Sequence, residues 1–204
     1  MRGAITTTNR IEALTMDPDR FAQVMIDDDA ALWDWLHQHH AQSDSVWLVT
    51  WKRGAGPTVS RDAVLDALLA HGWIDGRRMA RDDGRTMQLI SPRSQQRWTQ
   101  TYRDRVTRLT AQGQMHSAGL ACVAAAQRAG TWYADLDVDA LIVPDDLQAA
   151  LDTAGGASWF SNAAPSYRRN ILRYLKSAKQ AATRDKRITL IATTAARGQK
   201  VPNY

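Results

Sequence analysis

The segment HGWIDGRR, from His71 to Arg78, brings several side chains with chemical potential close together in the sequence. A carboxylate and an imidazole are common general acid-base groups, and guanidinium groups bind anions through paired hydrogen bonds. Two hypotheses follow. One is a binding site for an anionic group, and the alternative is a small-molecule enzyme in which Asp75 and His71 act beside Arg77 or Arg78.

Other arginine and tryptophan residues extend the binding hypothesis, because an aromatic face beside arginine suits a flat or anionic ligand. The predicted binding pocket consists of Arg53, Trp73, Asp75, Arg77, Arg78 and Arg93. A second candidate site is the pair Arg168 and Arg169.

Established catalytic motifs do not occur in the sequence: it has no nucleophile elbow, phosphate-binding glycine loop or metalloprotease helix motif. His37 and His40 have a helical spacing that suits a metal, but no carboxylate cluster accompanies them. Cys122 is the single cysteine, which excludes an internal disulfide and a cysteine-based zinc site. We therefore expect no metal or cofactor and favour a noncatalytic binding protein over an enzyme.

Basic residues are concentrated at the C-terminal end, where residues 165–204 hold ten Lys or Arg and one acid, Asp185. Such a basic pole is typical of proteins with an anionic partner, although a solvated helix face is the commoner explanation of a charge run. The partner would be an anionic small molecule, an acidic protein or, as a third alternative, nucleic acid. If nucleic acid binds, Arg168, Arg169 and Lys176 are expected to form the contact surface.

The composition is that of a globular protein, with 204 residues, 44% of them hydrophobic and 23% charged. No apolar run approaches the roughly 20 residues of a membrane span or forms a signal-peptide core, so we expect a cytoplasmic protein. Residues 1–15 lack periodicity and are predicted to be loose, and either Met1 or Met16 could be the start.

The N-terminal half predicts a small sheet with flanking helices. A short strand over 24–26 precedes a helix with Asp27 as its N-cap. The segment SVWLVTWK is apolar on both faces, which predicts a central strand, and Ser60 caps a second helix that ends at His71-Gly72.

Asp83-Gly84 predicts a two-residue hairpin turn. In the register that this turn requires, Arg78 lies on the apolar face of the hairpin and Arg77 on the polar face. A buried guanidinium needs a partner, so we expect Arg78 to be mostly buried and paired with a carboxylate such as Asp75 or Asp62.

After residue 93 the pattern becomes helical. Thr99 begins a helix in which Arg103 points outward, and prolines at helix starts predict a short helix from Pro144 and a long one from Pro165 to about Ala182. The fold class is therefore α+β. A small, mostly antiparallel sheet with flanking helices occupies residues 16–93, and a helical half packed on it occupies residues 94–204.

Five segments resemble the YdeI/OmpD-associated family, also labelled bacteriocin-protection proteins, in order and spacing. They are VWLVTWKRGAGP, ALLAHGWIDGRR, LISPR, RWTQTYRDRVTRLTAQGQM and APSYRRNILRYLKSAKQAATRDKRI. The resemblance extends from Asp27 to Ala196, with departures at Lys186, where family members often have Arg, and in MHSAGL. It implies a stress-protection or envelope-associated role, and it brings no established reaction or catalytic residues.

Overall fold

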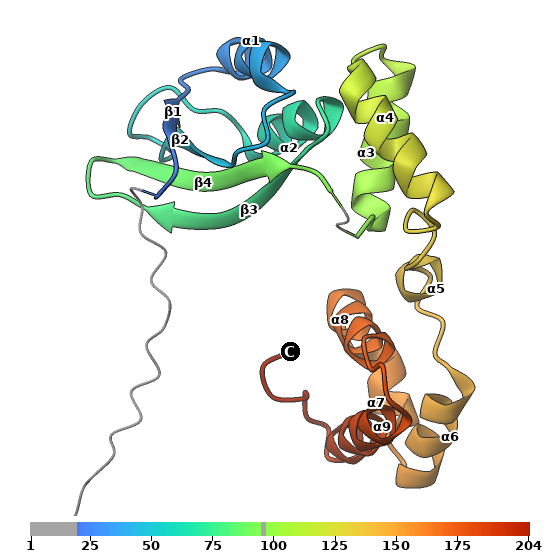
Figure 1. Ribbon diagram of the computed structural model, residues 1–204. Coiled ribbons are helices and arrows are strands. Elements are labelled where there is room, and N and C mark those ends of the chain that lie inside the picture. The colour runs from blue at the N-terminus through green and yellow to red at the C-terminus, as the bar shows by residue number, and fades with distance from the viewer. Residues whose placement is uncertain (1–19, 95–96) are drawn as a thin grey trace, which may run out of the picture. The chain divides into compact units, whose positions relative to one another are not determined.

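The computed structural model describes residues 20–94 and 97–204, so the predicted loose segment 1–15 lies outside the described residues. The chain divides into two compact units, Met1–Arg93 and Ser94–Tyr204. The N-terminal unit contains the sheet and the C-terminal unit contains helices alone among its described elements (Figure 1).

The sheet of the N-terminal unit has four strands in the order β1-β2-β4-β3. β1 pairs with β2 in parallel, whereas β4 pairs with both β2 and β3 antiparallel, so the prediction of a mostly antiparallel sheet is confirmed. β2 lies between two neighbours and its first five residues are buried, which confirms it as a central strand. The strands are β1 (Gln23–Met25), β2 (Val46–Trp51), β3 (Trp73–Ala80) and β4 (Arg85–Pro92).

Two helices, α1 (Asp29–His39) and α2 (Arg61–Ala70), lie on the same side of this sheet (Figure 1). Ser60 caps α2 by accepting a hydrogen bond from the backbone N–H of Ala63, as predicted. The N-cap of α1 is Asp28 rather than the predicted Asp27. The core between helices and sheet is built from Leu32, Leu36, Val46, Leu48, Val64, Leu68, Trp73 and Ile90.

The register of the β3–β4 hairpin differs from the prediction. The backbone N–H of Arg81 donates to the Arg85 carbonyl at 2.9 Å, so the connecting loop has three residues and ends at Gly84, whose φ is +78°. Arg78 consequently pairs with Gln88, one residue away from the register of a two-residue turn. An Asp-Gly sequence suits both loop lengths, since each needs a glycine with positive φ.

A bulge in β3 accompanies this shift. The ladder is interrupted between Asp75 and Arg78, and a Cβ on Gly76 would lie 3.2 Å from the Leu89 carbonyl oxygen. Arg77 and Arg78 are both exposed, so the predicted burial of Arg78 is wrong. In the observed register Arg78 lies opposite Gln88, whereas a two-residue turn would place it opposite Leu89.

The C-terminal unit consists of seven helices within its described residues. Its largest buried cluster joins residues of α5, α6, α7, α8 and α9. α8 ends well before the predicted Ala182, because Ser177 closes it and α9 starts four residues later. The helices are α3 (Gln100–Ala111), α4 (Ser117–Arg128), α5 (Leu136–Asp139), α6 (Asp145–Ala154), α7 (Ala157–Asn162), α8 (Pro165–Lys176) and α9 (Ala181–Ala196).

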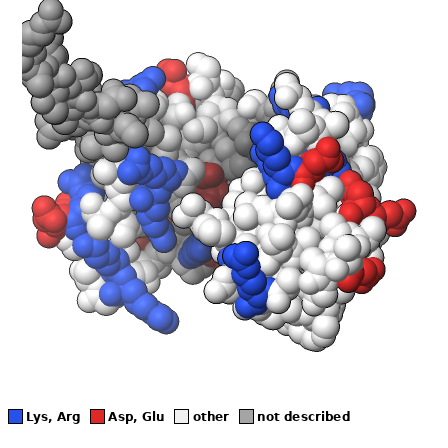
Figure 2. All heavy atoms as spheres, turned by 90° about the horizontal axis from the view of Figure 1, so that it is seen from below, with Lys and Arg blue, Asp and Glu red and all other residues white. Residues whose placement is uncertain are grey.

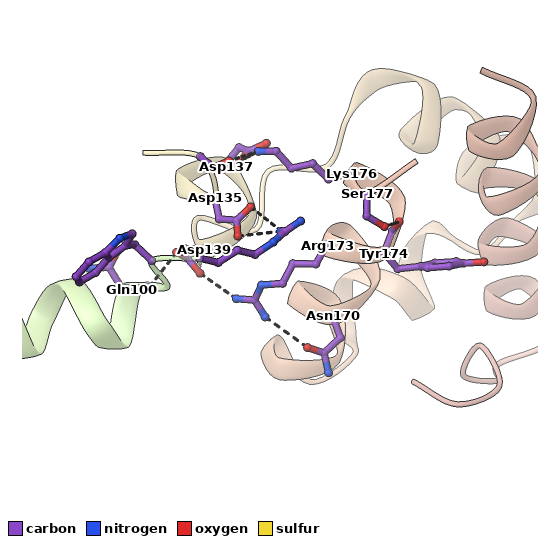
Figure 3. Close-up of polar contacts among 12 residues, drawn as sticks. Gln100, Asp135, Asp137, Asp139, Asn170, Arg173, Tyr174, Lys176 and Ser177 are labelled. Atoms are coloured by element: carbon purple, nitrogen blue, oxygen red, sulfur yellow. Dashed lines mark hydrogen bonds and ion pairs between the residues drawn. The ribbon is translucent and has the colours of Figure 1, made fainter. Parts of the chain in front are cut away.

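A buried ion-pair cluster connects α3, α5 and α8. The Asp139 carboxylate accepts from Arg103 at 2.7 Å and from Arg173 at 3.2 Å, and it also accepts from the backbone N–H of Gln100 at the start of α3 (Figure 3). The side chains of Arg103 and Asp139 are only 7% and 5% exposed, so the prediction that Arg103 points outward is wrong. Its charge is tolerated inside the unit because a carboxylate and backbone carbonyls accept from it.

Replacing Asp139 with Asn should lower the free energy of unfolding by about 3 kcal/mol, because two largely buried guanidinium groups lose their counter-charge. Asp137→Asn is the matched control. Asp137 lies on the same short helix and pairs with Lys176, but the two side chains are 48% and 37% exposed, so its loss should be below about 1 kcal/mol. Urea unfolding of the two variants measures the difference, and equal losses would show that the Asp139 cluster does not stabilise the unit.

Candidate anion-binding site

A pocket of about 460 Å³ lies in the N-terminal unit, where the end of β2, the following loop, the start of α2 and the hairpin meet. Its walls combine positive charge, hydroxyl groups and apolar surface. The lining residues are Trp51, Lys52, Arg53, Thr58, Val59, Ser60, Arg61, Arg78 and Thr86.

Four of these side chains are cationic, and none is acidic. Within the described residues, Arg53, Arg61 and Arg78 form no ion pair with a carboxylate. Lys52 donates to the Arg81 carbonyl at 2.6 Å, which orients its ammonium group without neutralising it. The cations therefore repel one another, and an anion in the pocket would offset that repulsion.

The packing of Trp51 positions the segment that carries two of these cations, Lys52 and Arg53. Its indole N–H donates to Asp27 at 2.8 Å, and the guanidinium of Arg85 lies over the ring at 4.1 Å. Gly56 packs so closely against the same ring that an added Cβ would lie 2.6 Å from it. The backbone N–H of Lys52 also donates to the Gly84 carbonyl, so the loop after β2 is fastened to the tip of the hairpin.

Two residues of the predicted pocket, Arg53 and Arg78, do line this cavity although they are distant in the sequence. The others lie elsewhere. Trp73 is 1% exposed and its indole N–H donates to the His40 carbonyl, so its side chain belongs to the core.

The remaining members of the predicted pocket also lie outside the cavity lining. Arg77 is exposed, Asp75 accepts a hydrogen bond from Gln88 at 3.2 Å, and Arg93 is buried. His71, the partner of Asp75 in the enzyme hypothesis, is buried, and its Nδ1 lies 2.8 Å from the Ala67 carbonyl oxygen. These positions give the acid-base hypothesis no support from the geometry.

Lys52 and Arg61 also line the pocket but were not predicted from the sequence as site residues. A usable signal exists in WKRGAGPTVSR, where basic residues stand at both ends of a glycine-proline loop that leads into a capped helix. Closing such a loop brings its ends together, and the start of a helix favours negative charge. The basic residues at the two ends would then be expected on one surface.

Basic side chains also gather on the visible face of the N-terminal unit, at the left of Figure 2, with few acidic ones among them. The basic pole at the C-terminal end is different, because acids of residues 137–146 neutralise part of it. Lys176 forms an ion pair with Asp137, and Arg184 forms a bidentate ion pair with Asp146. Lys176, one of the three residues of the nucleic-acid surface expected from the sequence, thus already has a carboxylate partner in the structure.

The second predicted pair, Arg168 and Arg169, divides between two environments. Arg168 donates to the Ser161 carbonyl at 3.3 Å and lies 5.8 Å from the centre of the Phe160 ring. Arg169 lines a separate pocket of the C-terminal unit. The two arginines therefore do not form one site.

Among the described residues, no cluster of three or more potential metal ligands occurs. In that same part of the chain, no helix combines the length and the apolar character that crossing a bilayer would need.

Comparison with protein families assigns the two ends of the chain differently. Residues 140–198 match the family described as Bacteriocin-protection, YdeI or OmpD-Associated, which confirms the resemblance over a shorter segment than the 27–196 expected. Residues 24–122 match a domain of unknown function (DUF8412), and the basic pocket lies within this segment. Comparison with curated proteins and with solved structures gives no significant match.

Gly56→Ala should destabilise the N-terminal unit by about 1–3 kcal/mol, because the added methyl group overlaps the Trp51 ring. Chemical denaturation of a double-mutant cycle with Trp51→Leu measures the effect. Removing the ring should remove most of the penalty of the alanine. An equal penalty in both backgrounds would mean that the ring does not hold the loop.

The hydrogen bonds from Arg184 lower the pKa of Asp146 below its ordinary value of 3.8. A carboxyl group whose pKa is lower in the folded protein stabilises it fully above the unfolded value, and this stabilisation is lost as the pH falls through the folded pKa. Carboxyl-detected NMR should show Asp146 titrating below 3.8, and Arg184→Ala should return it towards that value. Titration of Asp146 at the same pH in both proteins would contradict this.

Proposed function

We propose that this chain, whose residues 140–198 match the YdeI/OmpD-associated family, is a noncatalytic binding protein that recognises a small phosphate-bearing ligand in the pocket of its N-terminal unit. The observation that carries the proposal is the convergence of four cations on one cavity without a lining acid. Cations without a counter-charge in a concave site repel one another and destabilise the empty protein. A bound anion reduces this repulsion.

The chemistry of the lining suits a phosphate group. Arg53, Arg61 and Arg78 can each offer paired donors to its oxygens, which a planar guanidinium does better than an ammonium group. Thr58 and Thr86 add hydroxyl donors, and the first turn of α2 adds the positive end of a helix dipole.

The apolar part of the lining suits the remainder of the ligand. Trp51 and Val59 offer nonpolar surface beside the cations. The volume of about 460 Å³ lies within the range of small-molecule sites. A phosphorylated metabolite or nucleotide would therefore fit the lining better than inorganic phosphate alone.

Binding without catalysis is favoured by what the described lining contains. It offers no carboxylate, imidazole or thiol that could serve as a general base or activated nucleophile. The enzyme hypothesis remains the alternative, and it would require such a group to enter the site with the substrate. The family description supports a protective role for the bound state, which we include in the proposal together with a cytoplasmic location.

The test compares Arg78→Glu with Arg77→Glu, since the two arginines are adjacent, exposed and on the same strand, and only Arg78 lines the pocket. Calorimetric titration at about 150 mM salt with inorganic phosphate, pyrophosphate and ATP should show saturable binding to the unchanged protein. Arg78→Glu should weaken the binding at least tenfold, or about 1.4 kcal/mol, because it replaces a charge-assisted donor with a repelling carboxylate.

Arg77→Glu should bind within about twofold of the unchanged protein, because long-range charge alone is screened by salt. Absence of binding to all three probes would overturn the proposal. Equal weakening by both variants would also overturn it, since a diffuse basic surface would then explain the binding. Turnover of ATP or pyrophosphate by the unchanged protein would favour the enzyme alternative.

A further inference from the structure

A second pocket, of about 450 Å³, lies in the C-terminal unit between the start of α3, α5 and α8. Every residue of its lining is polar or charged. The four charged residues that line it are Asp104, Asp139, Arg169 and Arg173. Their formal charges cancel.

Two of these charges already have partners. Asp139 accepts from Arg173, which also lines the pocket (Figure 3), and from Arg103, which does not, so it forms part of the buried cluster. This carboxylate is 5% exposed and has little surface left for a ligand.

The other two charges, Arg169 and Asp104, have no ion-pair partner among the described residues. They line the same cavity from different helices, yet they do not approach each other within the 4.0 Å of an ion pair. Among the described residues, Asp104 accepts a side-chain hydrogen bond only from the Gln100 amide, at 2.6 Å. The cavity therefore presents one uncompensated cation on α8 and one uncompensated anion on α3.

Further donors lie beside Arg169 on α8. Arg173 follows it by four residues, so the two guanidinium groups belong to the same side of the helix. Arg173 donates to Asp139 and, at 3.4 Å, to Asn170, while its Nε has no hydrogen-bond acceptor among the described residues. Ser166 lies in the first turn of the same helix and also lines the cavity.

We infer that this pocket binds a free α-amino acid. Its carboxylate accepts hydrogen bonds from Arg169, with Arg173 beside it, and its ammonium group donates to Asp104. A zwitterion matches a lining whose charges cancel but lie apart, whereas a simple anion is repelled by Asp104 and a simple cation by Arg169.

Such a ligand would bridge α3 and α8, which the Asp139 cluster already joins. A ligand that binds only the folded state raises the melting temperature. The inference concerns the C-terminal unit alone, so it does not depend on the phosphate pocket of the N-terminal unit.

The test measures the melting temperature of the full chain with each of the twenty common L-amino acids, and with acetate and methylammonium as separate halves of the zwitterion. At least one amino acid should raise it saturably, and the two halves at the same concentration should not. For the best amino acid, calorimetry should show at least tenfold weaker binding to Arg169→Glu and to Asp104→Asn. Lys179→Glu is the control, because Lys179 is exposed and lies outside the cavity lining.

Circular dichroism and the melting temperature without ligand establish that the variants fold. The inference is overturned if no amino acid stabilises the protein, or if the stabilisation persists in both Arg169→Glu and Asp104→Asn. It is also overturned if acetate alone binds as tightly as the amino acid, since Asp104 would then have no role. Loss of phosphate binding in Arg78→Glu tests only the pocket of the N-terminal unit and does not bear on amino-acid binding to the C-terminal unit.

Discussion

The packing around the indole of Trp51 is the interaction on which the basic pocket depends. It connects three segments: Asp27 ahead of α1, Arg85 at the start of β4 and Gly56 in the loop after β2. Because that loop carries Lys52 and Arg53, the Trp51 ring determines the positions of two of the four cations that line the pocket. The aromatic residue that matters most to the site therefore acts through the loop it supports as well as through its own surface.

Cations gather without acids in the described lining of this pocket, whereas several cations of the C-terminal unit pair with carboxylates. In the C-terminal unit, Asp137, Asp139 and Asp146 each meet a basic partner from α8 or α9. The lining of the N-terminal pocket has no corresponding acid. Net charge along the sequence thus pointed to the basic pole, whereas pairing in the structure leaves the N-terminal pocket as the more strongly uncompensated site.

Much of the fold could be predicted from local patterns. The apolar run of β2, the Ser60 cap and the glycine after α2 each have a local physical cause, and each was predicted correctly. The hairpin register was not predictable in this way, because the aspartate-glycine pair suits loops of two or three residues. With the register shifted by one residue, Arg78 lies opposite Gln88 rather than Leu89, and it is exposed and lines a cavity.

The site could be predicted only in part, for a related reason. Arg53 and Arg78 are recognisable as basic residues, but the loop that brings them together is fixed by a tertiary contact with Trp51. Arg103 shows the same limit, since its helical position predicts exposure, whereas distant partners such as Asp139 and the Trp132 carbonyl explain its burial. Long-range partners decide such cases, and local periodicity carries no information about them.

The most direct measurement of anion binding in this pocket is NMR observation of the arginine Nε–H resonances during a titration with pyrophosphate. The resonances of Arg53, Arg61 and Arg78 should shift together along one saturable curve, because their side chains line one cavity. The resonance of Arg77 should stay nearly constant, since Arg77 does not line it. Independent, unsaturated shifts of all four resonances would contradict a single site and indicate a diffuse basic surface.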